Sequence, residues 1–348
     1  MQRSRVCRKA VTLLFAFTCL AHEVQYRKVF GSPQRDASVT VFYNLYVPLG
    51  KKGEERDSRN RILAIVQEQL EMVQPDRRIY INSIGTPHLE IAVRNATILK
   101  HYTMGNEVTT LYDVWKYCRE NEEQDVIYLH DKGSFHNTDG NNRLRRYVTE
   151  GATSGECARM SQLGCNFCVS RMSPLPHPHT SGNMWRAQCG YVAKLLDPQT
   201  FEGKMSSVPD KGIQAASCKG KQRYSAEHWI LSHPDAVPCD VDPTRGFLFG
   251  HPGDSNNPPG KGHVLPPRGF SKVLSRAPRF NRTYYRDLAK TIQHNKKYIK
   301  KASHKCLVDA GLTVQERLQE YAQLFGPEVQ PKDSWWGWKS LLNSSAQD

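Results

Sequence analysis

The sequence lacks the signatures by which nucleic-acid-binding proteins are usually identified. It has no zinc-finger spacing, no RNA-binding motif and no basic region that runs into heptads. Acidic residues are also few, since 34 Asp and Glu stand against 48 Lys and Arg and give a formal net charge of +14. Arg143, Arg145 and Arg146 are expected on the exposed basic face of one helix. This balance favours a polyanionic partner such as a nucleotide, an acidic polysaccharide or a membrane surface, and nucleic acid is not expected.

Long hydrophobic runs are missing as well. The apolar stretch at residues 10–21 is shorter than the ~20 residues that a bilayer span needs, and four basic residues precede it. A basic segment before a short apolar one is typical of a signal peptide, and residues 19–21 form an acceptable cleavage site. The alternative for residues 1–21 is a short uncleaved signal anchor, which would associate the chain with a membrane. Both alternatives direct the chain into the secretory pathway.

The cysteine count fits the same compartment. The ten cysteines, less Cys7 and Cys19 of the leader, leave eight. An even number behind a secretory leader indicates disulfides, although spacing does not give their connectivity. A zinc site built from Cys165, Cys168 and the nearby His177 and His179 is disfavoured on the same ground. N-glycosylation triplets also fit a lumenal chain, and they lie at Asn95, Asn281 and Asn343.

Strand and helix patterns alternate along the first part of the chain. Runs of β-favouring residues at 38–47, 78–85, 98–104 and 126–130 predict strands, and helical spacing of apolar residues separates them at 62–73 and 111–118. The order β-α-β-β-α-β predicts an α/β fold with a mostly parallel sheet flanked by helices. Right-handed crossovers then place the strand ends along one edge of the sheet.

The pattern weakens further along the chain. Helices are expected at 141–158, 184–196 and 224–232, around a cysteine- and proline-rich insertion. Residues 246–270 are rich in Gly, Pro and Asn and are expected to form a loop. Residues 271–348 are expected to form a helical extension, with helices at 286–302 and 313–324.

One predicted strand runs directly into polar residues. Residues 126–134 read V-I-Y-L-H-D-K-G-S, which puts a histidine, an aspartate, a lysine and a glycine at the carboxyl edge of the sheet. Folds of this class bind ligands at that edge. Asp131 is suited to hold a metal or a sugar hydroxyl, Lys132 a phosphate, and Gly133 permits close approach to the backbone. The alternative is an ordinary strand end with a polar turn.

Several motifs occur together in a fixed order. They are Y-L-H-D-K-G-S, then C-N-F-C and P-L-P-H-P-H, then S-G-N-M-W-R-A-Q-C-G-Y-V and Y-S-A-E-H-W-I. This set, which spans residues 39–239, resembles a family of secretory-pathway glycosyltransferase-like proteins distantly similar to rhamnan-synthesis and capsular-polysaccharide glycosyltransferases. The resemblance implies a GT-A-type catalytic domain at residues 38–245. It also implies transfer of a sugar from a nucleotide-sugar donor to a glycan or glycoprotein acceptor, in the Golgi lumen or after secretion.

The resemblance also implies roles for individual residues. Glu227 is the expected general base, because a carboxylate can deprotonate the acceptor hydroxyl as the nucleoside diphosphate leaves. The residues expected at the catalytic centre are Glu227, Asp131 and His130. Those expected at the donor are Tyr43, Asn44, Lys132, Gly133 and Ser134. Those expected at the sugars and the acceptor are Gly182, Asn183, Trp185, His228 and Trp229. The alternative for residues 181–185 is a helix cap with a core tryptophan, and for 227–229 two solvent-facing side chains with a packed tryptophan.

The chain departs from the GT-A pattern at the metal. The Asp-x-Asp that usually holds Mn²⁺ or Mg²⁺ is reduced to Asp131, so either this aspartate binds the cation or Lys132 neutralises the diphosphate instead. The literal Asp240-Val241-Asp242 is expected to be a surface turn. A secreted carbohydrate-binding protein that keeps the fold without catalysis is the main alternative function. A sulfotransferase-like enzyme needs a phosphate-binding loop after the first strand, which residues 47–53 match poorly.

Overall fold

The computed structural model describes residues 39–48, 55–86, 95–134, 137–170, 172–173, 178–207, 220–242 and 273–277. The chain divides into two compact units, Met1–Ala37 and Ser38–Asp348, and all the described residues lie in the second. The predicted leader, the loop at 246–270 and the helices at 286–302 and 313–324 therefore lie outside the described residues. The same holds for these individual residues: His177, Cys218, Asn281, Cys306 and Asn343.

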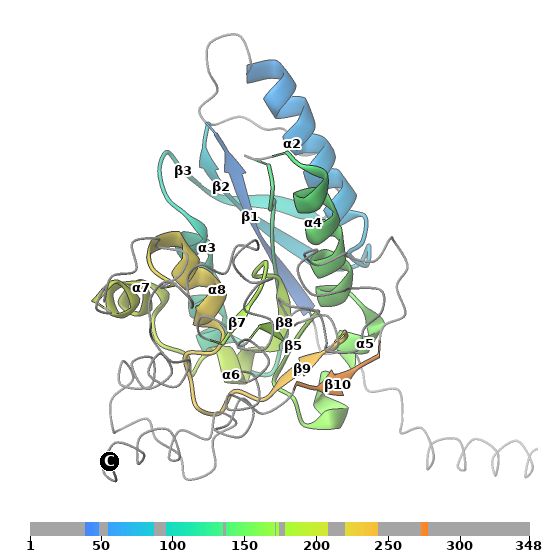
Figure 1. Cartoon of the computed structure of the whole chain (residues 1–348), viewed down its shortest axis with the longest axis vertical. Helices are drawn as coiled ribbons and strands as arrows, with labels where there is room; N and C mark the ends of the chain where they lie inside the picture. Colours follow the sequence, from blue (N-terminus) through green and yellow to red (C-terminus); the bar gives the residue numbers. More distant parts are fainter. Residues whose placement is uncertain are drawn as a thin grey trace, which may run out of the picture. The chain divides into compact units, whose positions relative to one another are not determined.

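The described residues form an α/β fold built on a mostly parallel sheet, as predicted (Figure 1). The strand order is β10-β9-β5-β8-β4-β1-β2-β3, and β1 pairs in parallel with both β2 and β4. A separate two-stranded sheet pairs β6 with β7. The strands are β1 (Val39–Val47), β2 (Arg78–Gly85), β3 (Ala96–Tyr102), β4 (Asp125–His130), β5 (Phe167–Val169), β6 (Met172–Ser173), β7 (His179–Thr180), β8 (Trp185–Gln188), β9 (Pro238–Asp240) and β10 (Ser275–Arg276).

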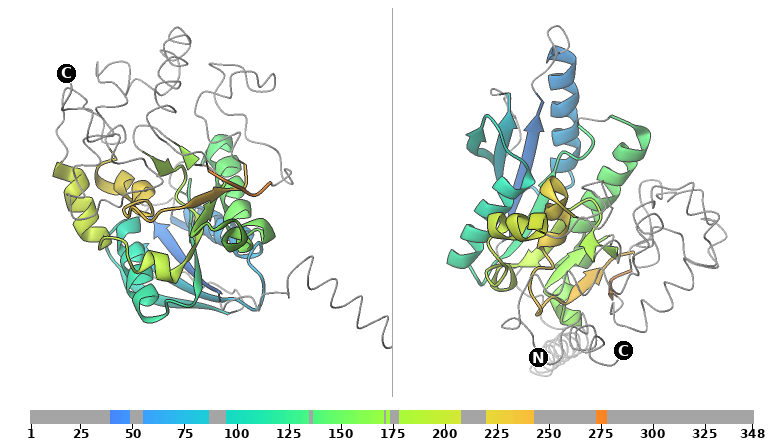
Figure 2. Two further views of the ribbon diagram at one scale, coloured as in Figure 1. Left: turned by 90° about the horizontal axis from the view of Figure 1, so that it is seen from below. Right: turned by 60° about the vertical axis from the view of Figure 1, so that its left-hand side comes forward.

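Helices cover both faces of the sheet. Figures 1 and 2 show α2 and α4 on one face and α3, α7 and α8 on the other. The α-helices are α2 (Glu55–Leu70), α3 (Glu107–Glu120), α4 (Asp139–Ala152), α5 (Gly155–Ala158), α6 (Cys189–Val192), α7 (Pro198–Ser207) and α8 (Ala226–Trp229). Two short 3₁₀ helices are η1 (Met160–Leu163) and η3 (Gln222–Ser225). No helix in the described ranges combines the length and apolar composition needed to cross a membrane.

Two of the three core clusters in the described residues lie one on each face of the sheet, and the third surrounds two of the disulfides. Strand β4 contributes side chains to the clusters on both faces, because successive side chains of a strand point to opposite faces. Val126 and Tyr128 join the cluster under α3, whereas Ile127 and Leu129 join the cluster under α2 and α4. This two-sided burial explains why β4 reads as a continuous apolar run rather than an alternating one.

The strand order creates a switch point at the carboxyl edge. The chain passes from β1 outward to β2 and β3, and then returns to the other side of β1 with β4. The connections that follow β1 and β4 therefore lead away from each other, and α/β folds bind ligands in the crevice that this leaves. Asn44 of β1 is the register partner of His130, so the polar strand end of β4 lies at this point, as predicted.

The helix predicted at 184–196 is wrong for its first half. Trp185–Gln188 instead forms β8, which lies antiparallel between β4 and β5. Arg186 pairs there with Asp125 of the neighbouring strand, at 2.8 Å. The helix predicted at 141–158 is also interrupted, because the Ser154 hydroxyl accepts the Cys157 N–H and begins α5 as a separate turn.

Three charged residues expected at the surface are buried. Asp240 and Asp242 do not form a surface turn, since their exposed fractions are 1% and 8%. Asp240 ends β9 and accepts the Met172 N–H, and Asp242 accepts the Tyr147 hydroxyl. These hydrogen bonds offset the cost of burying the carboxylates. Arg145 is buried as well, against the carboxylate of Glu68.

Disulfides are present, as the cysteine count predicted. They join Cys118 to Cys189, Cys157 to Cys168 and Cys165 to Cys239. Cys165 and Cys168 are thus both oxidised, which excludes the zinc site. Three disulfides fit a secreted or lumenal protein.

Candidate functional site

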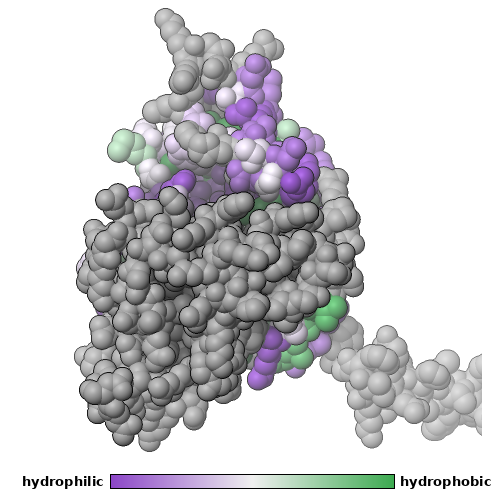
Figure 3. Space-filling view, viewed as in Figure 1, coloured by the Kyte–Doolittle hydropathy of each residue, from purple (hydrophilic) through white to green (hydrophobic). Residues whose placement is uncertain are grey.

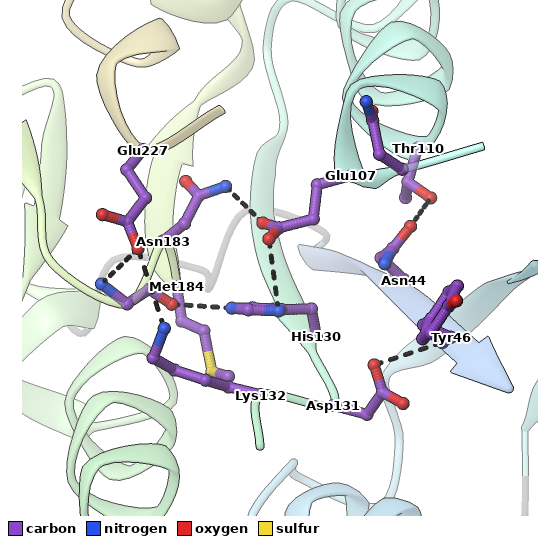
Figure 4. A network of polar contacts seen from close by, with 12 residues as sticks. Asn44, Tyr46, Glu107, Thr110, His130, Asp131, Lys132, Asn183, Met184 and Glu227 are labelled. Atoms are coloured by element: carbon purple, nitrogen blue, oxygen red, sulfur yellow. Dashed lines mark hydrogen bonds and ion pairs between the residues drawn. The ribbon is translucent and has the colours of Figure 1, made fainter. Parts of the chain in front are cut away.

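His130, the last residue of β4, lies at the centre of a buried polar network (Figure 4). Its Nε2 lies 2.7 Å from the carbonyl oxygen of Gly182, and its Nδ1 lies 3.6 Å from Oε1 of Glu107. Because a carbonyl oxygen only accepts, Nε2 carries the proton in this pair. Burial lowers the pKa of His130 below its ordinary value, although the Glu107 carboxylate opposes the shift. His130 is therefore a neutral, fixed imidazole at neutral pH.

Glu107 holds this network together from the opposite side. It opens α3 directly after the N-cap residue Asn106, whose side chain accepts the Val108 N–H. Oε2 of Glu107 accepts the Asn183 amide at 2.7 Å, while Oε1 faces His130. The carboxylate thus connects β4, α3 and the segment before β8. Glu107 was not predicted from the sequence, in which the available signal was an Asn-Glu helix start shortly after a predicted strand.

The Gly182–Asn183 turn is shaped by its backbone. Gly182 has φ +94°, and a Cβ at this position would lie 3.2 Å from the Val148 side chain. Asn183 also lies in the left-handed region, at φ 46°, which asparagine tolerates better than most residues. Its amide donates to Glu107, and its Oδ1 accepts the Trp185 indole N–H at 3.1 Å. Both ends of this buried amide are used within the protein, so Asn183 positions the turn.

Lys132 and Glu227 form a partly exposed ion pair within the cluster. The Lys132 ammonium lies 3.7 Å from Oε1 of Glu227, and the two side chains are 22% and 25% exposed. The same carboxylate oxygen accepts the Gly182 N–H at 3.3 Å. Burial acts to raise the pKa of Glu227, but Lys132, His179 and the Gly182 N–H outweigh it and lower the pKa below its ordinary value. Glu227 is consequently an ionised, partly exposed carboxylate beside a cation.

Asp131 turns away from this pair toward β1. Its Oδ1 accepts the Tyr46 N–H at 3.1 Å, while its buried Oδ2 makes no hydrogen bond within the described part of the chain. Burial raises the pKa of Asp131 to about 7, although the Tyr46 N–H opposes the shift. A substantial fraction of this carboxyl is therefore protonated at neutral pH.

The donor atoms around Asp131 do not suit a divalent cation. Mn²⁺ and Mg²⁺ prefer several carboxylate or carbonyl oxygens. Among the described residues, no group of three or more His, Cys, Asp or Glu side chains could hold a metal ion. The described residues therefore do not fit the cation of the usual GT-A site.

Three of the remaining residues predicted at the donor site make hydrogen bonds or packing contacts inside the fold. Tyr43 points to α2, where its hydroxyl donates to Gln69, and Asn44 accepts the Thr110 hydroxyl of α3. Gly133 is needed for packing, because a Cβ there would lie 2.8 Å from Asn141 of α4. Ser134 is buried beside them, with an exposed fraction of 3%.

The aromatic residues expected to stack on sugars are buried. Trp185 and Trp229 have exposed fractions of 0% and 1%, and the Trp229 indole donates to the Leu196 carbonyl at 2.7 Å. Neither ring offers a face to a ligand in this structure, so both follow the packed alternative. His228 is also buried, and its Nδ1 donates to the Pro178 carbonyl at 3.2 Å rather than facing solvent.

Gln69 of α2 is a second residue that the sequence analysis missed. It is fully buried, and its amide donates to the His130 carbonyl at 3.1 Å and to the Thr149 hydroxyl at 2.8 Å. It thereby fixes the end of β4 from the face opposite Glu107. A polar residue on the apolar side of a predicted helix was the available signal.

One protein family matches most of the chain. The sequence matches the family described as "Domain of unknown function (DUF8361)" over residues 42–340. The chain belongs to the DUF8361 family. No curated protein and no solved structure matches it. At the switch point the DUF8361 domain carries a polar cluster around the buried His130, together with the partly exposed ion pair Lys132–Glu227.

Proposed function

We propose that this DUF8361 protein is a glycosyltransferase of GT-A type that transfers a sugar from a nucleotide-sugar donor to a glycan or glycoprotein. The observation that supports this function best is the Lys132–Glu227 pair at the switch point of the sheet. The Lys132 ammonium and the Glu227 carboxylate lie 3.7 Å apart, and both side chains are partly exposed. The buried imidazole of His130, which is hydrogen-bonded to Gly182, lies next to them. This is the edge at which α/β folds bind nucleotides.

The pair offers the two functions that a single-displacement transfer requires. In the proposed reaction Glu227 takes the proton of the acceptor hydroxyl, whose oxygen attacks the anomeric carbon. The bond from that carbon to the diphosphate breaks, and the leaving oxygen gains the electron pair. Lys132 stabilises the charge that develops on the diphosphate, which takes the place of a divalent cation. Glu107, His130 and Gly182 position the pair.

The proposed location follows from the disulfides together with the leader. We place the chain in the secretory pathway, either anchored as a type II protein in the Golgi lumen or secreted. The nucleotide sugar and the glycan or glycoprotein acceptor would both be met there.

The test is a calorimetric titration of the secreted chain with UDP-, GDP- and dTDP-sugars, with and without Mn²⁺. We expect saturable binding of one donor with an affinity that Mn²⁺ does not change. Lys132→Met should weaken this binding at least tenfold, since a charge-assisted contact to phosphate is lost. Lys194→Met is the matched control, because Lys194 is a surface lysine paired with Asp235. Absence of donor binding in the unmodified chain would refute the proposal.

A carbohydrate-binding protein without catalysis is the second candidate. It is favoured by one observation, namely that Asp131 has no companion carboxylate suited to a metal among the described residues. The two candidate functions differ in the ligands they bind and in whether nucleoside diphosphate is released. The lectin-like protein would bind glycans on an array and would show neither donor binding nor release of nucleoside diphosphate.

A further inference from the structure

An open depression with several charged side chains in its lining lies between α2 and α4, on the opposite face of the sheet from Glu107. Its volume is about 380 Å³, within the range of small-molecule sites. It is lined by Arg61, Ala64, Ile65, Glu68, Asn137, Asn142, Arg145 and Arg146. Figure 3 shows that hydrophilic residues predominate on the surface of the described residues toward the α2 end of the molecule.

The charges in this depression are not balanced. Its lining carries three guanidinium groups and one carboxylate, that of Glu68. Arg145 and Arg146 both pair with Glu68, through Oε2 and Oε1 respectively. Both oxygens of Glu68 are therefore engaged, and among the described lining residues two positive charges remain in excess.

Arg61 has the weakest partner of the three arginines. Its only hydrogen bond within the described residues is a long one of 3.5 Å to the Ser58 hydroxyl, and its buried Nε makes none. The Nε of Arg145 is likewise buried without a hydrogen bond in the described part of the chain. Within the described residues Arg61 therefore has no anionic partner, and Arg145 and Arg146 share the single carboxylate of Glu68. Guanidinium groups that are partly withdrawn from water and incompletely paired favour an additional anion. The arrangement is what a site for an anion needs before the anion binds.

We propose that this depression binds a tetrahedral oxyanion, the sulfate or phosphate group of an ester ligand. Arg61 and Arg146 supply the planar donors that suit such a group. Arg145 lies behind them and keeps the wall in place, since its Nη1 donates to the Lys132 carbonyl and to Asn142. The exposed Ala64 leaves room above the helix for the body of the ligand. This proposal does not depend on the proposed transferase activity.

The test uses calorimetric titration of the full secreted chain with inorganic phosphate, inorganic sulfate and a sulfated heparin tetrasaccharide. Equal affinity for all three indicates recognition of the oxyanion alone, and tighter binding of the tetrasaccharide indicates a sulfated glycan as the source. In either case Arg61→Gln and Arg146→Gln should weaken binding about tenfold or more, because each removes a charge-assisted contact. Arg143→Gln is the matched control, since Arg143 is an exposed arginine of the same helix, α4.

A second pair of variants leaves the arginines in place. Ala64→Glu brings a carboxylate into the depression and should abolish binding of inorganic phosphate, whereas the neutral Ala64→Gln of nearly equal size should retain it. Ala64 is exposed on α2, so both substitutions are compatible with folding, which circular dichroism checks. The proposal is overturned if no probe binds. It is also overturned if Arg143→Gln weakens binding as much as Arg61→Gln, or if Ala64→Glu binds as tightly as Ala64→Gln.

Discussion

The ammonium of Lys132 and the carboxylate of Glu227 face each other at 3.7 Å across the end of β4 and the start of α8. His130 and Asn183, which lie around this pair, are buried, whereas the side chains of Lys132, Glu227 and Glu107 are partly exposed. An anionic ligand that reaches Lys132 must therefore compete with Glu227. Displacement by a diphosphate would free the carboxylate at the moment when a base is required.

Replacement of Glu227 by glutamine tests this coupling. In the proposed reaction Glu227→Gln removes the base, so turnover should fall by about 10²- to 10⁴-fold. Donor binding should be retained or become tighter, because a negative charge near the diphosphate is removed. Release of nucleoside diphosphate measures the first effect and calorimetry the second.

The control for this variant is Glu123→Gln, an exposed glutamate in the turn before β4. It should change neither quantity. Unchanged turnover in Glu227→Gln would contradict the role of Glu227 as the base, and a parallel loss of donor binding would assign the residue to structure instead.

Asp131 makes stability depend on pH. Its pKa of about 7 in the folded state lies above the ordinary value of 3.8, so the folded state binds more protons. The carboxyl thus costs little stability at low pH, and this cost grows as the pH rises from about 4 to 7. A pKa shift of this size destabilises the folded state by roughly 4 kcal/mol at pH 8. Asp131→Asn removes this cost, but its own unpaired amide costs about 1–3 kcal/mol. Asp131→Asn should therefore be more stable than the unmodified chain at pH 8 and lose that advantage near pH 5.

Urea denaturation at pH 5, 6, 7 and 8 measures this difference. Asp76→Asn serves as the control, because Asp76 is an exposed aspartate paired with its neighbour Arg77. A constant free-energy difference between Asp131→Asn and the unmodified chain across this range would contradict the assignment.

Local patterns predicted the parallel half of the sheet well. Strands β1, β2 and β4 are largely buried and are rich in β-favouring residues, and the polar residues after Leu129 identified the carboxyl edge. Right-handed crossovers were enough to bring Asn44 and His130 together.

The other half depends on contacts between segments distant in sequence. Trp185–Gln188 has no strand pattern of its own and becomes β8 because β4 and β5 lie on either side of it. Asp240 and Arg145 look like surface residues until their partners, the Met172 N–H and Glu68, are known. Glu107 was missed for the same reason, since only the fold brings it to His130 and Asn183.

The left-handed backbone at Asn183 predicts that glycine destabilises the protein less than alanine at this position, which is the reverse of the usual order. Asn183→Ala and Asn183→Gly both lose the contacts to Glu107 and Trp185, and each should cost about 1–3 kcal/mol for the groups left unpaired. Alanine pays a further ~1 kcal/mol or more for the left-handed conformation, which glycine adopts freely. The glycine variant should therefore be the more stable of the two in urea denaturation. Greater stability of the alanine variant would show that the turn relaxes when the amide is removed.

The disulfides should differ in what they contribute to stability. Cys118–Cys189 joins α3 to α6 across a sequence separation of 71, whereas Cys157–Cys168 closes a separation of 11. Because a cross-link restricts the unfolded chain more when it closes a longer loop, the double alanine variants should lose about 4 and about 3 kcal/mol respectively. Chemical denaturation of both variants beside the unmodified chain measures the order. All four cysteines are buried, so both variants lose similar packing and the comparison isolates the loop. A larger loss for Cys157–Cys168 would mean that this bridge acts on the folded state, by holding α5 against β5.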